Sequence, residues 1–154
     1  MGCELERKFL VSESRLPELV KGNTIRQGYI KTKGKSVVRL RSTPKASYIT
    51  IKGPLTGISR SEFEYEIPRE EADEILDSLC SQPLIEKTRY KIKHVSHVWE
   101  IDVFHGLNKG LIVAEVELEF ENEEVALPDW VSSEVSDDRR YSNSNLCKNA
   151  FSTW

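Results

Sequence analysis

Charged side chains recur at every second position in segment after segment of this chain, with apolar residues between them. The first such segment is Glu4-Leu5-Glu6-Arg7-Lys8, in which Glu4, Glu6 and Lys8 share one face of a strand and Leu5 points to the other. The alternation returns further along the chain at Arg39 and Arg41, at Glu62, Glu64 and Glu66, at Lys87, Arg89, Lys91 and Lys93, at Glu100 and Asp102, and at Glu115, Glu117 and Glu119. A side-chain period of two over so many segments predicts a mainly β fold.

The alternating segments are separated by turn residues such as Pro44, Gly53-Pro54 and His105-Gly106. They predict strands at roughly residues 3–11, 24–33, 36–43, 46–53, 59–67, 85–94, 97–105 and 111–120. Eight antiparallel strands with few helices indicate an eight-stranded closed β-barrel or a strongly curved sheet. The length of 154 residues predicts one domain over residues 1–154.

Four short helical segments are expected around the strands. Pro68 precedes an acidic first turn, and the apolar stripe that follows it predicts a helix. A second short helix is expected within residues 12–20, although Pro17 interrupts it early. The tail predicts a helical turn at residues 128–130 and another near residues 143–151, and the segment 143–154 is a candidate plug for one end of the barrel.

The strands are ionic on one face, and two arrangements explain this. In the first arrangement the ionic faces point outward into solvent, where charged residues are ordinary in an antiparallel sheet, and the apolar faces fill the barrel. However, some strands carry almost pure carboxylate and others pure Lys and Arg, which indicates charge gathered around an ionic ligand. The ionic faces then point inward, and the apolar faces are covered by helices, by Trp99 and Trp130, or by the partner chain of a homodimer.

An interior lined with carboxylates requires positive charge among them, because neighbouring carboxylates cannot all stay ionised. One or two divalent cations, Mg²⁺ or Mn²⁺, suit such oxygen ligands. Rows of Arg and Lys opposite would hold an anion of several charges. A metal together with a polyanion indicates a phosphate chain as the small-molecule partner.

The composition excludes several other functions. A net charge of −3 and an isoelectric point near 5.7 give no general attraction to nucleic acid or anionic membranes. Cys3, Cys80 and Cys147 are odd in number and lack metal-ligand spacing, which predicts free thiols in a reducing compartment. No signal peptide and no apolar run of membrane-spanning length are visible. We therefore expect a cytoplasmic protein without nucleic-acid or membrane partners.

The N-terminal segment also matches a known motif, E-x-E-x-K, which here is Glu4, Glu6 and Lys8. The match continues through Arg26-Gln27-Gly28-Tyr29, Val38-Arg39-Leu40-Arg41, Thr50-Ile51-Lys52, Glu62-Phe63-Glu64-Tyr65-Glu66, Glu86-Lys87-Thr88-Arg89-Tyr90, Glu100-Ile101-Asp102-Val103-Phe104, Ala114-Glu115-Val116-Glu117 and Asp138-Arg139-Arg140-Tyr141-Ser142-Asn143. In this ordered set the chain resembles the CYTH superfamily of triphosphate tunnel metalloenzymes, and its small bacterial members in particular. The resemblance implies an eight-stranded antiparallel tunnel with a charged interior, and divalent-metal-dependent hydrolysis of triphosphates.

The same resemblance implies roles for individual residues. The carboxylates that hold metal would be Glu4, Glu6, Glu115 and Glu117, with a second acidic group of Glu62, Glu64, Glu100 and Asp102. The phosphate cradle would be Lys8, Arg39, Arg41, Lys52, Lys87, Arg89 and Arg140. Phosphoryl transfer needs positioning and charge neutralisation. Glu64 or Asp102 would accept the proton of the attacking water, and Lys87 would assist the leaving pyrophosphate.

Three functions remain open from the sequence. The first is an inorganic triphosphatase that splits tripolyphosphate into pyrophosphate and phosphate. The second is a nucleotide-processing relative, such as an adenylate cyclase, a nucleoside or thiamine triphosphatase, or an RNA 5′-triphosphatase. The third is a non-catalytic polyphosphate-binding module. The short chain shows no segment suited to a base or a ribose, which favours the first.

Overall fold

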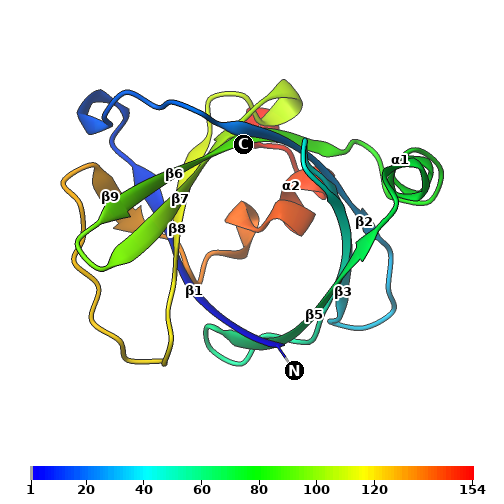
Figure 1. The fold of residues 1–154 in the computed structure, drawn as a ribbon, viewed down its shortest axis with the longest axis horizontal. Coiled ribbons are helices and arrows are strands. Elements are labelled where there is room, and N and C mark those ends of the chain that lie inside the picture. The colour runs from blue at the N-terminus through cyan, green and yellow to red at the C-terminus, as the bar shows by residue number, and fades with distance from the viewer. Residues whose placement is uncertain (1) are drawn as a thin grey trace.

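In the computed structural model, which describes residues 2–154, one antiparallel sheet of nine strands curls into a ring (Figure 1). The strands are β1 (Gly2–Val11), β2 (Asn23–Ile30), β3 (Val37–Ser42), β4 (Ser47–Lys52), β5 (Ser59–Ile67), β6 (Ile85–His94), β7 (His97–Phe104), β8 (Ile112–Glu117) and β9 (Val131–Glu134). Their order is β5-β4-β3-β2-β6-β7-β8-β1-β9, and β1 also pairs back onto β5, so that β1 to β8 close the ring. The predicted eight-stranded closed barrel is therefore confirmed.

Strand β1 has three partners. One edge pairs with β8 over residues 6–10, while the other edge pairs first with β5 over residues 2–5 and then with β9 at Phe9 and Val11. The sequence did not predict β9, and it lies directly after the segment where a helical turn was expected. Residues 128–131 form a hydrogen-bonded turn instead, in which Val131 N donates to Pro128 O at 3.2 Å. A four-residue strand is too short to show a clear period of two.

Two α-helices and four 3₁₀ turns complete the fold. The helices are α1 (Arg69–Ser78) and α2 (Asn143–Lys148), and the 3₁₀ turns are η1 (Glu13–Arg15), η2 (Gly106–Asn108), η3 (Arg139–Tyr141) and η4 (Phe151–Thr153). The helix expected within residues 12–20 is reduced to η1, because Leu16 takes the extended conformation that a following proline favours. None of the helices formed by residues 2–154 combines the length and the apolar character needed to cross a membrane.

The apolar faces of the strands point outward and are covered mostly by the chain itself. Helix α1 packs Leu76 against Leu40 on the outside of β2, β3 and β4. On the opposite side Trp99 is fully buried between Phe9 and Trp130, with ring centroids 5.5 Å and 5.6 Å away. The interior is thus left to the ionic faces, as the inverted arrangement predicts.

Helix α2 lies inside the ring (Figure 1). Its Leu146 and Cys147 pack with Ile85, Phe104 and Val113, whose side chains come from the inner faces of β6, β7 and β8. This apolar cluster fills one end of the barrel. The C-terminal segment therefore closes that end, and the ionic part of the interior forms a pocket above it.

Candidate active site

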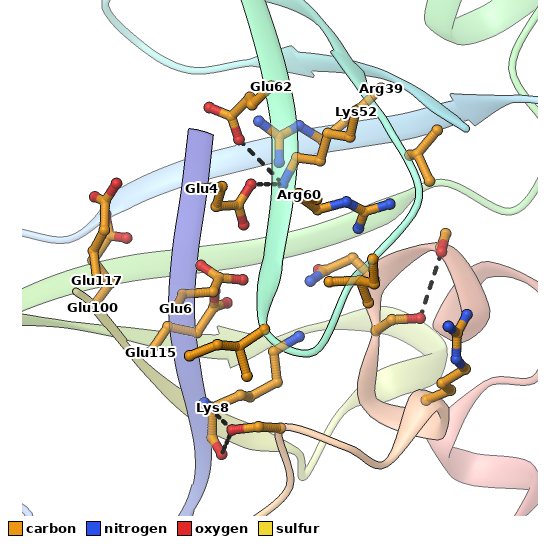
Figure 2. Close-up of a pocket in the computed structure, with 18 of the residues that line it drawn as sticks. Glu4, Glu6, Lys8, Arg39, Lys52, Arg60, Glu62, Glu100, Glu115 and Glu117 are labelled. Atoms are coloured by element: carbon orange, nitrogen blue, oxygen red, sulfur yellow. Dashed lines mark hydrogen bonds and ion pairs between the residues drawn. The ribbon is translucent and has the colours of Figure 1, made fainter. Parts of the chain in front are cut away.

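A cavity of about 320 Å³ occupies the ionic part of the barrel interior (Figure 2). Its wall takes inward-facing side chains from all eight strands of the ring, β1 to β8, together with residues 55–58 and 135–144. The predicted carboxylates that line it are Glu4, Glu6, Glu62, Glu64, Glu100, Glu115 and Glu117. The predicted cations that line it are Lys8, Arg39, Arg41, Lys52 and Arg89. Strands far apart in the sequence thus bring most of the predicted site together.

Four carboxylates from three adjacent strands form what we call the acidic wall: Glu6, Glu100, Glu115 and Glu117. Strand register places Glu6 opposite Glu117 and Glu115 opposite Glu100, and Figure 2 shows Glu6 and Glu115 side by side. Burial, and then the charge of Glu115, raise the pKa of Glu6 well above its ordinary value. Burial alone would raise the pKa of Glu115 too, but Lys8 and Arg89 outweigh it and lower that pKa. The surroundings of the Glu6–Glu115 pair therefore disfavour a negative charge on both carboxylates at once.

A second carboxylate pair surrounds Lys52. The ammonium Nζ lies 2.6 Å from Glu4 Oε2 and 3.5 Å from Glu62 Oε2. Burial opposes ionisation of Glu4, but Glu62 and Lys52 outweigh it and lower the pKa of Glu4. The hydrogen bond with Glu4, and then burial, raise the pKa of Glu62 to about 7. Despite the ionic contact, Glu4 Oε2 is a buried acceptor without hydrogen-bond geometry to any group within residues 2–154.

These carboxylates fit a hard divalent cation in their chemistry. All are oxygen donors, which Mg²⁺ and Mn²⁺ prefer, and the raised pKa of Glu6 marks a place where positive charge is lacking. As they are arranged, no three or more acidic, His or Cys side chains in residues 2–154 already form a metal-holding group. The donors are present, and closing them around an ion requires side-chain movement.

Arg39 and Arg41 form the cationic wall, and neither makes an ion pair within the part of the chain that the structure describes. Arg39 Nη2 donates to Thr50 Oγ1 at 3.2 Å, but Arg39 Nε is buried and finds no acceptor in residues 2–154. Burial, and then the charges of Arg39 and Arg89, lower the pKa of Arg41 to about 10. Unsatisfied donors and crowded cations are both relieved when an anion enters.

Lys87 and Asp102 lie behind Arg89 and outside the cavity lining. Asp102 accepts from Arg89 Nε at 2.7 Å and from Arg89 Nη2 at 2.9 Å, and Lys87 Nζ lies 2.8 Å from its Oδ2. Lys87 also donates to Asn143 Oδ1 of α2 at 3.0 Å. Burial would raise the pKa of Asp102, but Lys87 and Arg89 outweigh it and lower that pKa. Of these three side chains, only that of Arg89 reaches the cavity, where its Nη1 lies 3.3 Å from Glu100 Oε2.

For three further arginines the structure differs from what the sequence predicted. Arg140 pairs with Asp138 at 2.7 Å and lies over two aromatic rings, outside the cavity lining. Its neighbour Arg139 lines the cavity instead. Arg60, which was also missed, lines the cavity from the start of β5 and donates from Nε to Gly53 O at 2.9 Å. Its signal was visible, because Arg60 continues the alternation of Glu62 by two residues.

Comparison with known proteins agrees with this geometry. The family model described as CYTH domain matches residues 3–145. The chain is 50% identical over 151 residues to an inorganic triphosphatase of Acetivibrio thermocellus, covering 98% of this chain and 97% of that protein. It is 37% identical over 147 residues to an inorganic triphosphatase of Nitrosomonas europaea, covering 93% and 95%.

A solved structure of an inorganic triphosphatase superposes with a TM-score of 0.67 at 32% identity, covering 96% of this chain and 95% of that one. The match thus extends over nearly the whole of both chains. This chain belongs to the CYTH domain family.

Proposed function

We propose that this protein is a divalent-metal-dependent inorganic triphosphatase that hydrolyses tripolyphosphate to pyrophosphate and phosphate, with residues 1–154 acting as one triphosphate tunnel domain. The observation that carries the proposal is an acidic wall and an unpaired cationic wall facing one cavity that is closed at one end. The identity of 50% with a relative of that name supports the choice of substrate. At about 320 Å³ the cavity is near the small end of ligand sites, which span roughly 300–1,000 Å³.

The cationic wall would bind the triphosphate. Arg39 and Arg41 offer forked donors that match phosphate oxygens, and neither is committed to a carboxylate. Lys8 and Arg89 would add charge from the opposite strands, and Lys52 would become available once a metal replaces it beside Glu4. In this scheme Arg139 takes the role in phosphate binding that the family resemblance implies for Arg140.

The acidic side would hold the metal. Glu4, Glu6, Glu115 and Glu117 are the candidate ligands for one Mg²⁺ or Mn²⁺, and Glu62, Glu64 and Glu100 are candidates for a second. A bound cation would neutralise charge on the phosphate oxygens and orient them. Charge balance supports this assignment, because a cation beside Glu6 and Glu115 would offset the repulsion between these two carboxylates.

Among the carboxylates, Glu64 is the best placed to accept the proton of the attacking water. It lines the cavity, is solvent-exposed, and makes no ion pair within residues 2–154. Asp102 is less suited to that role, because Arg89 and Lys87 occupy both of its oxygens. We therefore assign to Asp102 and Lys87 the role of holding Arg89 in position. Arg89 and Lys8 would neutralise the charge that develops on the leaving pyrophosphate.

We also propose a cytoplasmic location and a homodimer for this protein. Cys3, Cys80 and Cys147 are all free thiols, which supports a cytoplasmic location. The outer face of β5 leaves Phe63 and Tyr65 exposed, and sedimentation analysis of the purified protein tests whether a second copy covers them in a homodimer.

The test is phosphate release from tripolyphosphate, ATP and pyrophosphate, each with Mg²⁺, Mn²⁺ or a chelator. The variant Glu6→Gln removes one acidic-wall carboxylate, and Glu134→Gln makes the same chemical change outside the cavity. Metal-dependent turnover of tripolyphosphate well above ATP, lost in Glu6→Gln and kept in Glu134→Gln, supports the proposal. Preferential use of ATP or a cyclic product would point to the nucleotide-processing relatives, and binding of tripolyphosphate without turnover would point to a non-catalytic module.

A further inference from the structure

Gln27 is a polar side chain sealed inside the barrel, and none of the roles above uses it. It lies on β2 and is 0% exposed. Its Oε1 accepts from Arg41 Nε at 3.3 Å, and its Nε2 donates to the Tyr29 hydroxyl at 2.8 Å. One amide therefore links a guanidinium of the cationic wall to a phenol that also lines the cavity.

The direction of both hydrogen bonds follows from the chemistry of the partners. An arginine side chain is a donor only, so the group of Gln27 that faces Arg41 has to be the amide oxygen. The amide nitrogen then faces Tyr29, and the phenol oxygen must accept its hydrogen. A flipped amide would set two donors against each other at Arg41. The Tyr29 hydroxyl therefore cannot donate to Gln27, and no other acceptor for its hydrogen is found among residues 2–154.

We infer that Gln27 is a positioning residue that turns the Tyr29 hydroxyl hydrogen toward the cavity, where it donates to a phosphate oxygen of the bound triphosphate. The inference rests on the proposed function for the identity of the ligand. Burial raises the pKa of Tyr29 to about 12, so the phenol keeps the hydrogen it is to donate. The bond to Arg41 Nε has a parallel effect, because it leaves the two terminal nitrogens of that guanidinium for the anion.

The variant Gln27→Glu tests this with little change of shape. A carboxylate accepts from both neighbours, so Arg41 stays bonded while the Tyr29 hydrogen turns away from the cavity. The variant Tyr29→Phe removes the same donor directly. Each change is expected to weaken tripolyphosphate binding about tenfold to a hundredfold, the usual worth of a hydrogen bond to a charged group. The loss should appear in KM, with kcat nearly unchanged, because the bond forms in both the bound and transition states.

The double variant separates positioning from the added negative charge. If Gln27 acts through Tyr29, the loss caused by Gln27→Glu should shrink by about fivefold or more in the Tyr29→Phe background, where only the charge effect persists. The matched control is Ser47→Ala, which removes a buried hydrogen bond to Ser42 at 3.1 Å outside the cavity and should leave tripolyphosphate affinity unchanged.

Binding is measured by titration calorimetry with tripolyphosphate in chelator, alongside turnover with metal and thermal unfolding of every variant. If a folded Gln27→Glu variant binds tripolyphosphate as tightly as the wild type, the inference is overturned. It is also overturned if the loss of affinity in the double variant equals the product of the losses in the two single variants. If the wild type binds tripolyphosphate with the expected pattern but never hydrolyses it, the proposed function fails and the inference holds. If the wild type does not bind tripolyphosphate, both fail.

Discussion

Replacing Asp102 by Asn separates a structural role for this carboxylate from the catalytic one that its place in the sequence suggested. Asp102 is buried and receives hydrogen bonds from Arg89 at 2.7 Å and 2.9 Å, with the Lys87 ammonium at 2.8 Å. Asn keeps one acceptor oxygen but turns an NH₂ group toward one of these donors. The substitution thus replaces the carboxylate that Lys87 and Arg89 share by a single neutral acceptor, while Lys87 keeps Asn143 and Arg89 keeps Glu100.

The expected cost is large because Asp102 and Lys87 are out of contact with solvent. Removing one partner of a buried ion pair costs about 3–5 kcal/mol. For a chain of this size each kcal/mol lowers the melting temperature by about 2–4 °C, so Asp102→Asn should melt about 6–20 °C below the wild type. Lys87→Met should cost less, because Arg89 still neutralises Asp102. The double variant should cost less than the sum of the two, with a coupling of about 0.5–3 kcal/mol.

Urea unfolding gives the free energy from the midpoint and slope, and turnover of tripolyphosphate is measured at a temperature where every variant is folded. On the structural account, Asp102→Asn shifts the midpoint strongly and retains part of its activity as long as Arg89 stays in place. An unchanged midpoint together with a loss of turnover of about a thousandfold or more would refute it, and would return Asp102 to the role of general base.

Four further outcomes follow from the geometry. Glu6→Gln should weaken Mn²⁺ binding about tenfold or more, measured by calorimetry, and an unchanged affinity would remove Glu6 from the metal site. Arg39→Gln should raise the KM for tripolyphosphate about tenfold to a hundredfold with little change in melting temperature, because Arg39 makes no ion pair among residues 2–154 and loses only its hydrogen bond to Thr50; a large drop in stability would contradict this. Leu146→Ala should cost about 2–5 kcal/mol in urea unfolding, because Leu146 is fully buried in the plug, and a cost under about 1 kcal/mol would mean that the plug is not packed as described. Arg7 lowers the pKa of Glu134, so Glu134→Gln should cost only about 0.2–1 kcal/mol near pH 7, and this difference should vanish as pH falls through the lowered pKa; a difference that persists in acid would contradict the ion pair.

The barrel was predictable because its inner and outer faces differ so strongly in chemistry. A period of two places Glu6 and Lys8 on one face whatever their neighbours do, and the contrast between carboxylate and ammonium strands indicated an ionic interior. The alternation shows which face of a strand a residue lies on, but not how far along the tunnel that residue lies. Lys87 and Asp102 share a face with Arg89, yet they lie at the level where α2 enters the ring, so they are sealed while Arg89 is not.

Loops and short elements were predicted less well, for a related reason. Arg139 and Arg140 are adjacent in a 3₁₀ turn, where no simple period decides which side chain faces the cavity. The pairing of β9 with β1 depends on contacts between opposite ends of the chain. Gln27 carried no signal, since a neutral amide between charged strands gains meaning only once Arg41 and Tyr29 are seen beside it.

The three partners of β1 also determine when the barrel can close during synthesis. β1 is made early, but β5 pairs with only its first residues, and its remaining partners lie beyond residue 111. Until β8 and β9 have left the ribosome, one edge of this strand stays open to any other chain, and such edges are templates for aggregation. Closure joins residues far apart in the sequence, which slows folding. Translation that stalls before Glu117 should therefore yield insoluble product, while the released full chain folds.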